Sequence, residues 1–193
     1  MGWFQDEMEF GPIALINRSI LVDPRNPEMQ RRINLKIKFR EDFRLFAPSV
    51  MRELVSKYFE FEGESLFMLF VHKLKTNLFF NSMPSYISER LYGKVCDYPA
   101  VTHVDNSARI QTVSKLDNPK YYSLLRAFEK ISGCGMVVNT SFNVRGEPIV
   151  CSPCDAYICF METNMDALVI GDYLLLKKNQ PIWEKDKNKF KLD

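Results

Sequence analysis

The chain has 193 residues, of which 46% are hydrophobic and 13% aromatic, and its formal net charge is +2. This length suffices for one domain with a sizeable core, and the composition excludes a largely disordered chain. So small a charge does not indicate nucleic-acid or anionic-membrane binding. An anion site would therefore depend on local clusters of lysine and arginine.

The spacing of the cysteines and the first residues of the chain indicate the cellular compartment in which we expect the protein. Five cysteines at irregular spacing do not indicate a disulfide framework. The start, Met-Gly-Trp-Phe-Gln-Asp-Glu, lacks the apolar core of a signal peptide, and no apolar run approaches the ~20 residues of a membrane helix. We therefore expect a cytoplasmic protein without a membrane span.

The first predicted helix follows a loop-rich entry over residues 1–26. Asn26 suits the N-cap and Pro27 the first helical position, and apolar residues recur at helical spacing up to Ile37. Lys36, Lys38 and Arg40 gather where this helix ends. In isolation, such cations usually form a solvated helix end that complements the helix dipole.

The middle of the chain is predicted to contain a helix over residues 48–59, a strand over 66–71 and one short helix near 86–91. Two further strands are predicted over 100–104 and 109–113, with Asp105-Asn106-Ser107 as the turn between them. For His103, a structural or substrate-contact role is favoured over proton transfer. Arg109 suits either an anion or an ordinary ion pair.

The last part of the chain has the clearest local signals. Asn118 and Pro119 start a helix that Gly133 ends, and Ser152-Pro153 start another that reaches about Glu162. Residues 136–138 and 149–150 are predicted as strands, and 168–176 as one buried strand with a glycine irregularity. Residues 179–193 are predicted to be a charged, flexible tail.

A loop crowded with polar groups lies between the two short strands. Asn139, Thr140, Ser141 and Asn143 offer hydroxyls and amides, and Arg145 offers a planar fork of donors suited to phosphate or carboxylate. One interpretation is a ligand-binding loop. The alternative is a polar hairpin whose hydroxyls cap its own backbone.

Other chemistries find less support. Cys151-Ser152-Pro153-Cys154 has no second C-x-x-C with which to complete a zinc site, so we predict no metal site held by the protein. The sequence contains no G-x-S-x-G and no Walker loop. The two histidines, His72 and His103, stand beside no obvious nucleophile, which disfavours covalent catalysis.

Several long motifs resemble the C-terminal domain of the carbamoyltransferase family that includes the nodulation protein NodU. They are Asn-Thr-Ser-Phe-Asn-Val-Arg-Gly-Glu-Pro-Ile-Val from residue 139, Arg-Glu-Asp-Phe-Arg-Leu-Phe-Ala-Pro-Ser-Val from residue 40 and residues 99–113. The opening segment is also similar, although Asp6-Glu7 stand where the family has Gly-Arg, Ile13 where it has Arg and Ile16 where it has Gly. Ser141-Phe142-Asn143 and Lys38-Phe39-Arg40 further resemble the S-x-N and K-x-R elements of YrdC-like domains.

This resemblance implies a YrdC-like α/β fold over residues 1–178, with a twisted mixed β-sheet flanked by helices. It also implies an enzyme domain that turns carbamoyl phosphate and ATP, with Mg²⁺ accompanying the nucleotide, into carbamoyl adenylate. An actin-like ATPase-fold domain or subunit, ahead of this segment in the family, is expected to pass the carbamoyl group to an acceptor hydroxyl.

The resemblance also assigns the site. Lys38, Arg40, Ser141 and Asn143 are expected to be catalytic, and both Lys38→Ala and Ser141→Ala to lose activity. Substrate or nucleotide binding is expected from Arg18, His103, Arg109, Asn139, Thr140 and Arg145. The hypothesis requires two motifs about a hundred positions apart to line one pocket.

Two other function classes stay open. Ile13 and Ile16 would suit a non-catalytic remnant or the partner subunit of a split carbamoyltransferase. An RNA-binding module is a weaker hypothesis, because the near-neutral charge argues against it.

Overall fold

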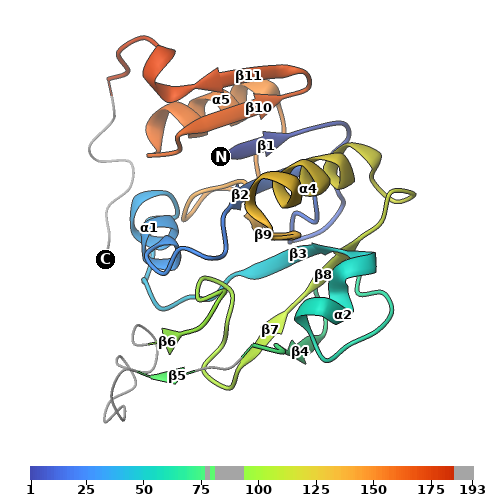
Figure 1. The fold of residues 1–193 in the computed structure, drawn as a ribbon. Coiled ribbons are helices and arrows are strands. Elements are labelled where there is room, and N and C mark those ends of the chain that lie inside the picture. The colour runs from blue at the N-terminus through green and yellow to red at the C-terminus, as the bar shows by residue number, and fades with distance from the viewer. Residues whose placement is uncertain (77–78, 81–93, 185–193) are drawn as a thin grey trace. The chain divides into compact units, whose positions relative to one another are not determined.

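A computed structural model describes residues 1–76, 79–80 and 94–184 (Figure 1). The chain forms two compact units. The first comprises Met1–Val22, Arg31–Arg44 and Asn139–Asp193, and the second Asp23–Gln30 and Leu45–Val138. The single domain expected over residues 1–178 stays a prediction. The short helix expected near residues 86–91 lies outside the described residues.

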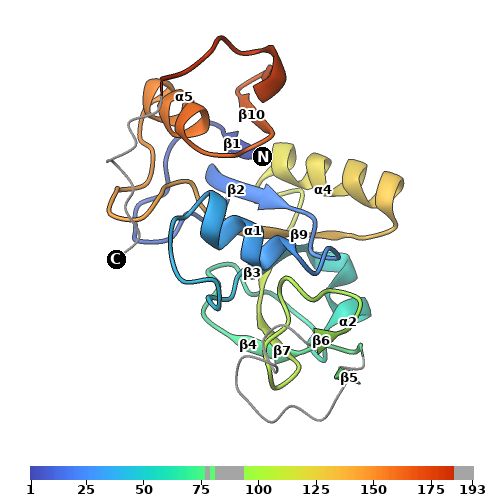
Figure 2. The ribbon, with the colours of Figure 1, turned by 90° about the vertical axis from the view of Figure 1, so that its left-hand side faces the viewer.

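The first unit is built on a mixed sheet. Strand β1 (Gly2–Phe4) runs parallel to β10 (Ala167–Ile170) and antiparallel to β2 (Arg18–Val22), and β11 (Tyr173–Leu176) pairs antiparallel with β10. Helix α5 (Pro153–Glu162) packs on β1 and β10. Helix α1 (Met29–Lys36) leads into the segment that carries Lys38 (Figure 2). Strand β9 (Met136–Ser141) begins in the second unit and ends in the first.

The second unit has parallel and antiparallel pairs as well. Strand β3 (Ala47–Met51) runs parallel to β8 (Gln111–Val113), and β4 (Val71–Lys73) pairs antiparallel with β7 (Ser107–Arg109). Helix α4 (Pro119–Ser132) packs on β3. The shorter elements are the 3₁₀ helix η1 (Arg52–Leu54), α2 (Val55–Tyr58) and the pair β5 (Phe79–Phe80) and β6 (Lys94–Val95), while the first unit adds η2 (Lys177–Asn179).

These elements confirm the predicted α/β class with a mixed sheet flanked by helices. The two best-marked helices were predicted correctly: the Asn118 side chain caps α4 through the Tyr121 amide at 2.9 Å, and Ser152 forms a capping box with Asp155 at the start of α5. No helix among the described residues is long and apolar enough to cross a membrane.

Other predicted elements were wrong or shifted. Residues 47–51 are a fully buried strand instead of the start of a helix over 48–59. The strand predicted over 66–71 begins only at Val71, and residues 100–104 and 149–150 form no strand. The strand predicted over 168–176 is the hairpin of β10 and β11, because Gly171 adopts φ 55° and reverses the chain. At residues 47–51, burial within the sheet overrode the helical spacing of the apolar residues.

Candidate functional site

Lys38 joins the two motifs that the sequence placed about a hundred positions apart. It follows α1 in a tight turn, in which its amide donates to the Ile33 carbonyl at 2.8 Å. Its buried Nζ donates to the backbone carbonyl of Ser141 and to Asn143 Oδ1, the latter at 2.8 Å. The Arg145 amide in turn donates to the Lys38 carbonyl at 3.1 Å. Both segments belong to the first unit.

A cationic pocket of about 220 Å³ opens beside Lys38. Its walls carry three further cations, Arg40, Arg44 and Arg145, and one carboxylate, Glu41, which lies 3.2 Å from Arg44. The rest of the lining is Asn143, Val144 and Gly146. Four cations against one paired carboxylate make this pocket suited to a doubly or triply charged anion.

Asn34 organises the segment that carries these cations. It is fully buried, and its Oδ1 accepts from Arg40 Nε at 2.8 Å while its Nδ2 donates to the carbonyls of Asp42 and Arg44. Asn34 and Arg44 were missed from the sequence. The sequence signal for Asn34 was a polar residue on the apolar face of α1. The signal for Arg44 was its place as the second arginine of the Arg-Glu-Asp-Phe-Arg motif.

Burial and mutual repulsion shift the pKa values of the pocket cations. Burial, followed by the charge of Arg40, lowers the pKa of Lys38 from its ordinary 10.5 to about 7. Burial, followed by Arg44, lowers the pKa of Arg40 to about 10. Burial and like charge therefore disfavour the charged forms of both groups, and an anion that enters the pocket would stabilise those charged forms.

The polar residues at the end of β9 support a neighbouring loop. Asn139 Nδ2 donates to the Leu15 carbonyl at 2.7 Å, and Ser141 Oγ accepts from the Ala14 amide at 3.0 Å. Thr140, between them, is half-buried. Lys38 therefore contacts the backbone of Ser141, while the Ser141 hydroxyl supports residues 14–15.

Arg18 is built into the sheet of the first unit. Its Nη atoms donate to the carbonyls of Gln5, Asn17 and Asp6, and its guanidinium stacks 3.6 Å from the centre of the Phe4 ring. These contacts fix the entry loop. The substrate-binding role of Arg18 stays a prediction.

His103 and Arg109 belong to the second unit. Arg109 is exposed at the end of β7, opposite Val71. His103 forms a polar chain with Ser107, whose Oγ lies 3.1 Å from His103 Nδ1 and donates to Asp105 Oδ1 at 2.5 Å. Because the serine has one proton and gives it to the carboxylate, its oxygen accepts from Nδ1–H. Neutral His103 then keeps its lone pair on Nε2.

Replacing Ser107 with alanine removes the oxygen that accepts from His103 Nδ1–H. Neutral His103 is then expected to shift from the Nδ1–H tautomer toward the Nε2–H tautomer. Imidazole ¹⁵N chemical shifts above the histidine pKa measure the tautomer, with His72 as internal reference. Ser114→Ala, which removes a similar serine from Asp117, is the matched control and leaves His103 unchanged. An Nε2–H tautomer in the unsubstituted chain contradicts the assignment.

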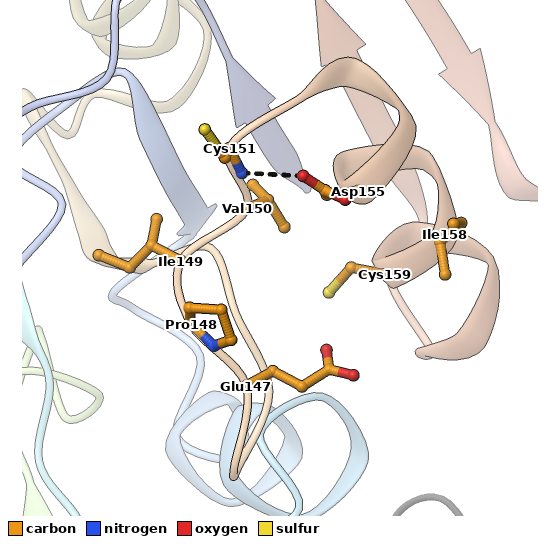
Figure 3. A pocket seen from close by; sticks show the side chains of 8 residues that line it. All are labelled: Glu147, Pro148, Ile149, Val150, Cys151, Asp155, Ile158 and Cys159. Carbon is orange, nitrogen blue, oxygen red and sulfur yellow. Dashed lines mark hydrogen bonds between the residues drawn. The ribbon is translucent and has the colours of Figure 1, made fainter.

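A second pocket of about 330 Å³ lies between residues 147–151 and α5 (Figure 3). The Cys159 sulfur is turned toward it, and the Cys151 amide donates to Asp155 at 3.2 Å. The described residues that line it include Glu147 and Asp155 and no cation, so it suits phosphate less than the pocket at Lys38. Among the described residues, no group of three or more His, Cys, Asp and Glu side chains is placed to hold a metal ion.

Residues 1–177 match the family model described as the carbamoyltransferase C-terminus. The chain belongs to the carbamoyltransferase family. It is 54% identical over its whole length to an uncharacterized protein of Synechocystis, and 42% identical over 92% of its length to the nodulation protein NolO of Bradyrhizobium diazoefficiens. It is also 34% identical over 89% of its length to a 3'-hydroxymethylcephem-O-carbamoyltransferase of Amycolatopsis lactamdurans.

This carbamoyltransferase segment spans only part of those relatives. It covers 32% of the Synechocystis protein, 30% of NolO and 29% of the Amycolatopsis enzyme. The matched part of the family is its C-terminal region. About two thirds of each relative therefore lies outside the segment described here.

The departures in the opening segment fall in the loop between β1 and β2. Asp6 stands where the family has glycine and adopts φ 37°, a conformation that aspartate tolerates better than most residues. Ile13, in place of arginine, directly precedes Ala14, whose amide donates to Ser141. The loop thus keeps its attachment to β9 while it carries less positive charge than the family pattern.

Proposed function

We propose that this segment forms carbamoyl adenylate within an O-carbamoyltransferase, and that the pocket at Lys38 binds the phosphate groups of its substrates. One observation carries the proposal. The Lys38 ammonium is held by the Ser141 carbonyl and Asn143 inside a pocket that three arginines also line. A fixed lysine and planar guanidinium groups are the donors that recognise phosphate.

The proposed chemistry needs charge stabilisation more than a nucleophilic side chain. Water cleaves carbamoyl phosphate to carbamate and phosphate. A carbamate oxygen then attacks the α-phosphorus of ATP, the bond to the bridging oxygen breaks and pyrophosphate leaves. Negative charge grows on the phosphate oxygens in this step, and cations fixed beforehand stabilise it without reorganising.

Mg²⁺ would accompany ATP in this reaction. Among the described residues that line the pocket, Glu41 is the one carboxylate, and it already pairs with Arg44. These donors do not form an all-protein magnesium site. The ion fits better as part of the nucleotide complex, held by phosphate oxygens and water.

Transfer of the carbamoyl group to a hydroxyl is assigned to the region that this segment lacks relative to its long relatives. Two relatives carry the name 3'-hydroxymethylcephem-O-carbamoyltransferase, which places a carbamoyl group on an oxygen in those proteins. By analogy, the acceptor here is a hydroxyl. The competing hypothesis, a non-catalytic remnant or partner subunit, predicts neither adenylate formation nor nucleotide binding.

Exchange of labelled pyrophosphate into ATP tests the proposal directly. We expect exchange that requires carbamoyl phosphate or ammonium carbamate and that fails when acetate replaces them. Calorimetric titration with Mg-ATP runs in parallel. Absence of both exchange and ATP binding in the folded chain would establish the non-catalytic alternative, whereas acetate-supported exchange would contradict the substrate assignment.

A further inference from the structure

An exposed apolar ridge in the second unit ends at the first residue of β4. It consists of Phe67, Leu69, Phe70 and Val71, which are 58%, 69%, 63% and 51% exposed. Together they leave on the order of 400 Å² of apolar surface in water, the size at which a patch on a soluble protein usually has a binding role. Single exposed apolar residues are ordinary, but four within five positions are not.

The ridge is anchored by ordered backbone. Ser65 exchanges hydrogen bonds with Thr112 through its amide and carbonyl, and the Ile110 amide donates to the Phe70 carbonyl at 3.3 Å. Met68, between the exposed residues, is buried and adopts φ 54°. A non-glycine residue in this region costs of order 1 kcal/mol. The segment therefore turns Met68 inward while Phe67 and Leu69 stay outside.

Charges flank the ridge on both sides. Glu62 and Glu64 precede it, Lys73 and Lys75 follow it, and Glu64 pairs with Arg52. An apolar centre with a charged rim is the usual composition of a protein–protein interface. The charges on the two sides have opposite signs, which does not favour an anionic surface as the occupant.

We propose that the apolar ridge docks against the region that precedes this segment in long carbamoyltransferases. That region makes up about two thirds of the relatives reported above and is part of the same chain as the matched C-terminal segment in them. An aromatic surface that is exposed to water promotes aggregation, whereas one that stays covered by another part of the same protein does not. The inference uses the family assignment and does not depend on carbamoyl-adenylate chemistry.

Cysteine labelling measures whether the ridge is covered. Leu69→Cys is made in this chain, and the aligned position is changed to cysteine in the full-length Synechocystis relative. Maleimide labelling is followed peptide by peptide by mass spectrometry, because exposed Cys151 and Cys154 also react. We expect labelling at least tenfold slower in the full-length protein. Leu116→Cys, at a position that is 92% exposed in the same unit, is the matched control and labels equally fast in both.

The alternatives give distinct results. Equal labelling at position 69 in both proteins overturns the proposal and leaves the ridge for an external partner. Labelling of this chain that slows as its concentration rises indicates a second copy as the occupant, and it overturns the proposal as well. Protection in the full-length protein that persists on dilution supports docking within one chain. Pyrophosphate exchange plays no part in this readout, so the two proposals fail independently.

Discussion

Replacing Lys38 with methionine is expected to reduce pyrophosphate exchange by about 100-fold or more and to abolish ATP binding in the range that calorimetry measures. The substitution removes the buried ammonium of Lys38 while it keeps an unbranched side chain of similar length. Exchange kinetics and calorimetric titration measure the two effects. Lys36→Met, two positions earlier and exposed, removes the same charge from the same segment and serves as the control.

The fold of the Lys38→Met chain is expected to survive. Burying an ammonium costs free energy, as the lowered pKa of Lys38 records, and methionine removes that cost. The Ser141 carbonyl and Asn143 Oδ1, which belong to half-buried residues, lose a donor, and this costs at most roughly 1–3 kcal/mol for each group. The two changes oppose each other, so thermal unfolding should show a small shift. Full activity in a folded Lys38→Met chain contradicts the proposed site.

The pH dependence of binding follows from the same group. The folded pKa of Lys38 is about 7, so above pH 7 most molecules carry a neutral amine. An anion that binds the protonated form takes up a proton, and its affinity falls toward tenfold per pH unit above pH 7. Calorimetry in two buffers of different ionisation enthalpy counts that proton. The Lys36→Met chain, which keeps Lys38, takes up the same proton.

Ser141 is expected to matter less than Lys38. From the sequence, both alanine substitutions were expected to lose activity. In the structure, Lys38 contacts the Ser141 carbonyl, which alanine retains, and the hydroxyl accepts from the Ala14 amide. Ser141→Ala therefore acts through the entry loop, and a partial loss of exchange is the physically consistent result.

Local chemistry explains what the sequence could predict of the fold. Caps and a following glycine act within a few residues, so α4 and α5 were predicted at their observed bounds. Strand β3 was missed because Val50, Leu54 and Tyr58 recur at helical spacing, whereas the burial of all five residues from Ala47 to Met51 depends on the surrounding sheet. Tertiary contacts decided that segment.

The features of the candidate site could likewise be predicted from the sequence only in part. Polar and charged motif residues indicate which groups gather, so Lys38, Asn143 and Arg145 were predicted to share a pocket, and they do lie together. The direction of the chain at the end of β9 decides whether Lys38 contacts the carbonyl or the hydroxyl of Ser141. No sequence motif encodes that direction. Asn34 was missed because a buried asparagine becomes recognisable only when the carbonyls it satisfies are known.

A chain that starts with a free amine at Met1 is expected to gain about 2 kcal/mol of stability between pH 6 and pH 8 from that group alone. The amine donates to the Leu21 carbonyl at 2.8 Å, where β1 meets β2. Burial, partly offset by Asp166, lowers its pKa from 8.0 to about 6. The folded state therefore binds fewer protons than the unfolded state in this window, and stability rises with pH until the unfolded amine has also lost its proton.

Urea unfolding at pH 5.5, 7 and 8.5 measures this contribution. A matched chain carries two extra residues ahead of Met1, so that an uncharged amide donates to the same Leu21 carbonyl. Because Lys38 also stabilises the fold as pH rises above 7, only the difference between the two chains isolates the amine. The extended chain should be more stable at pH 5.5, with the two curves meeting near pH 8.5. Parallel curves at all three pH values would show that the amine of Met1 titrates as it does in water.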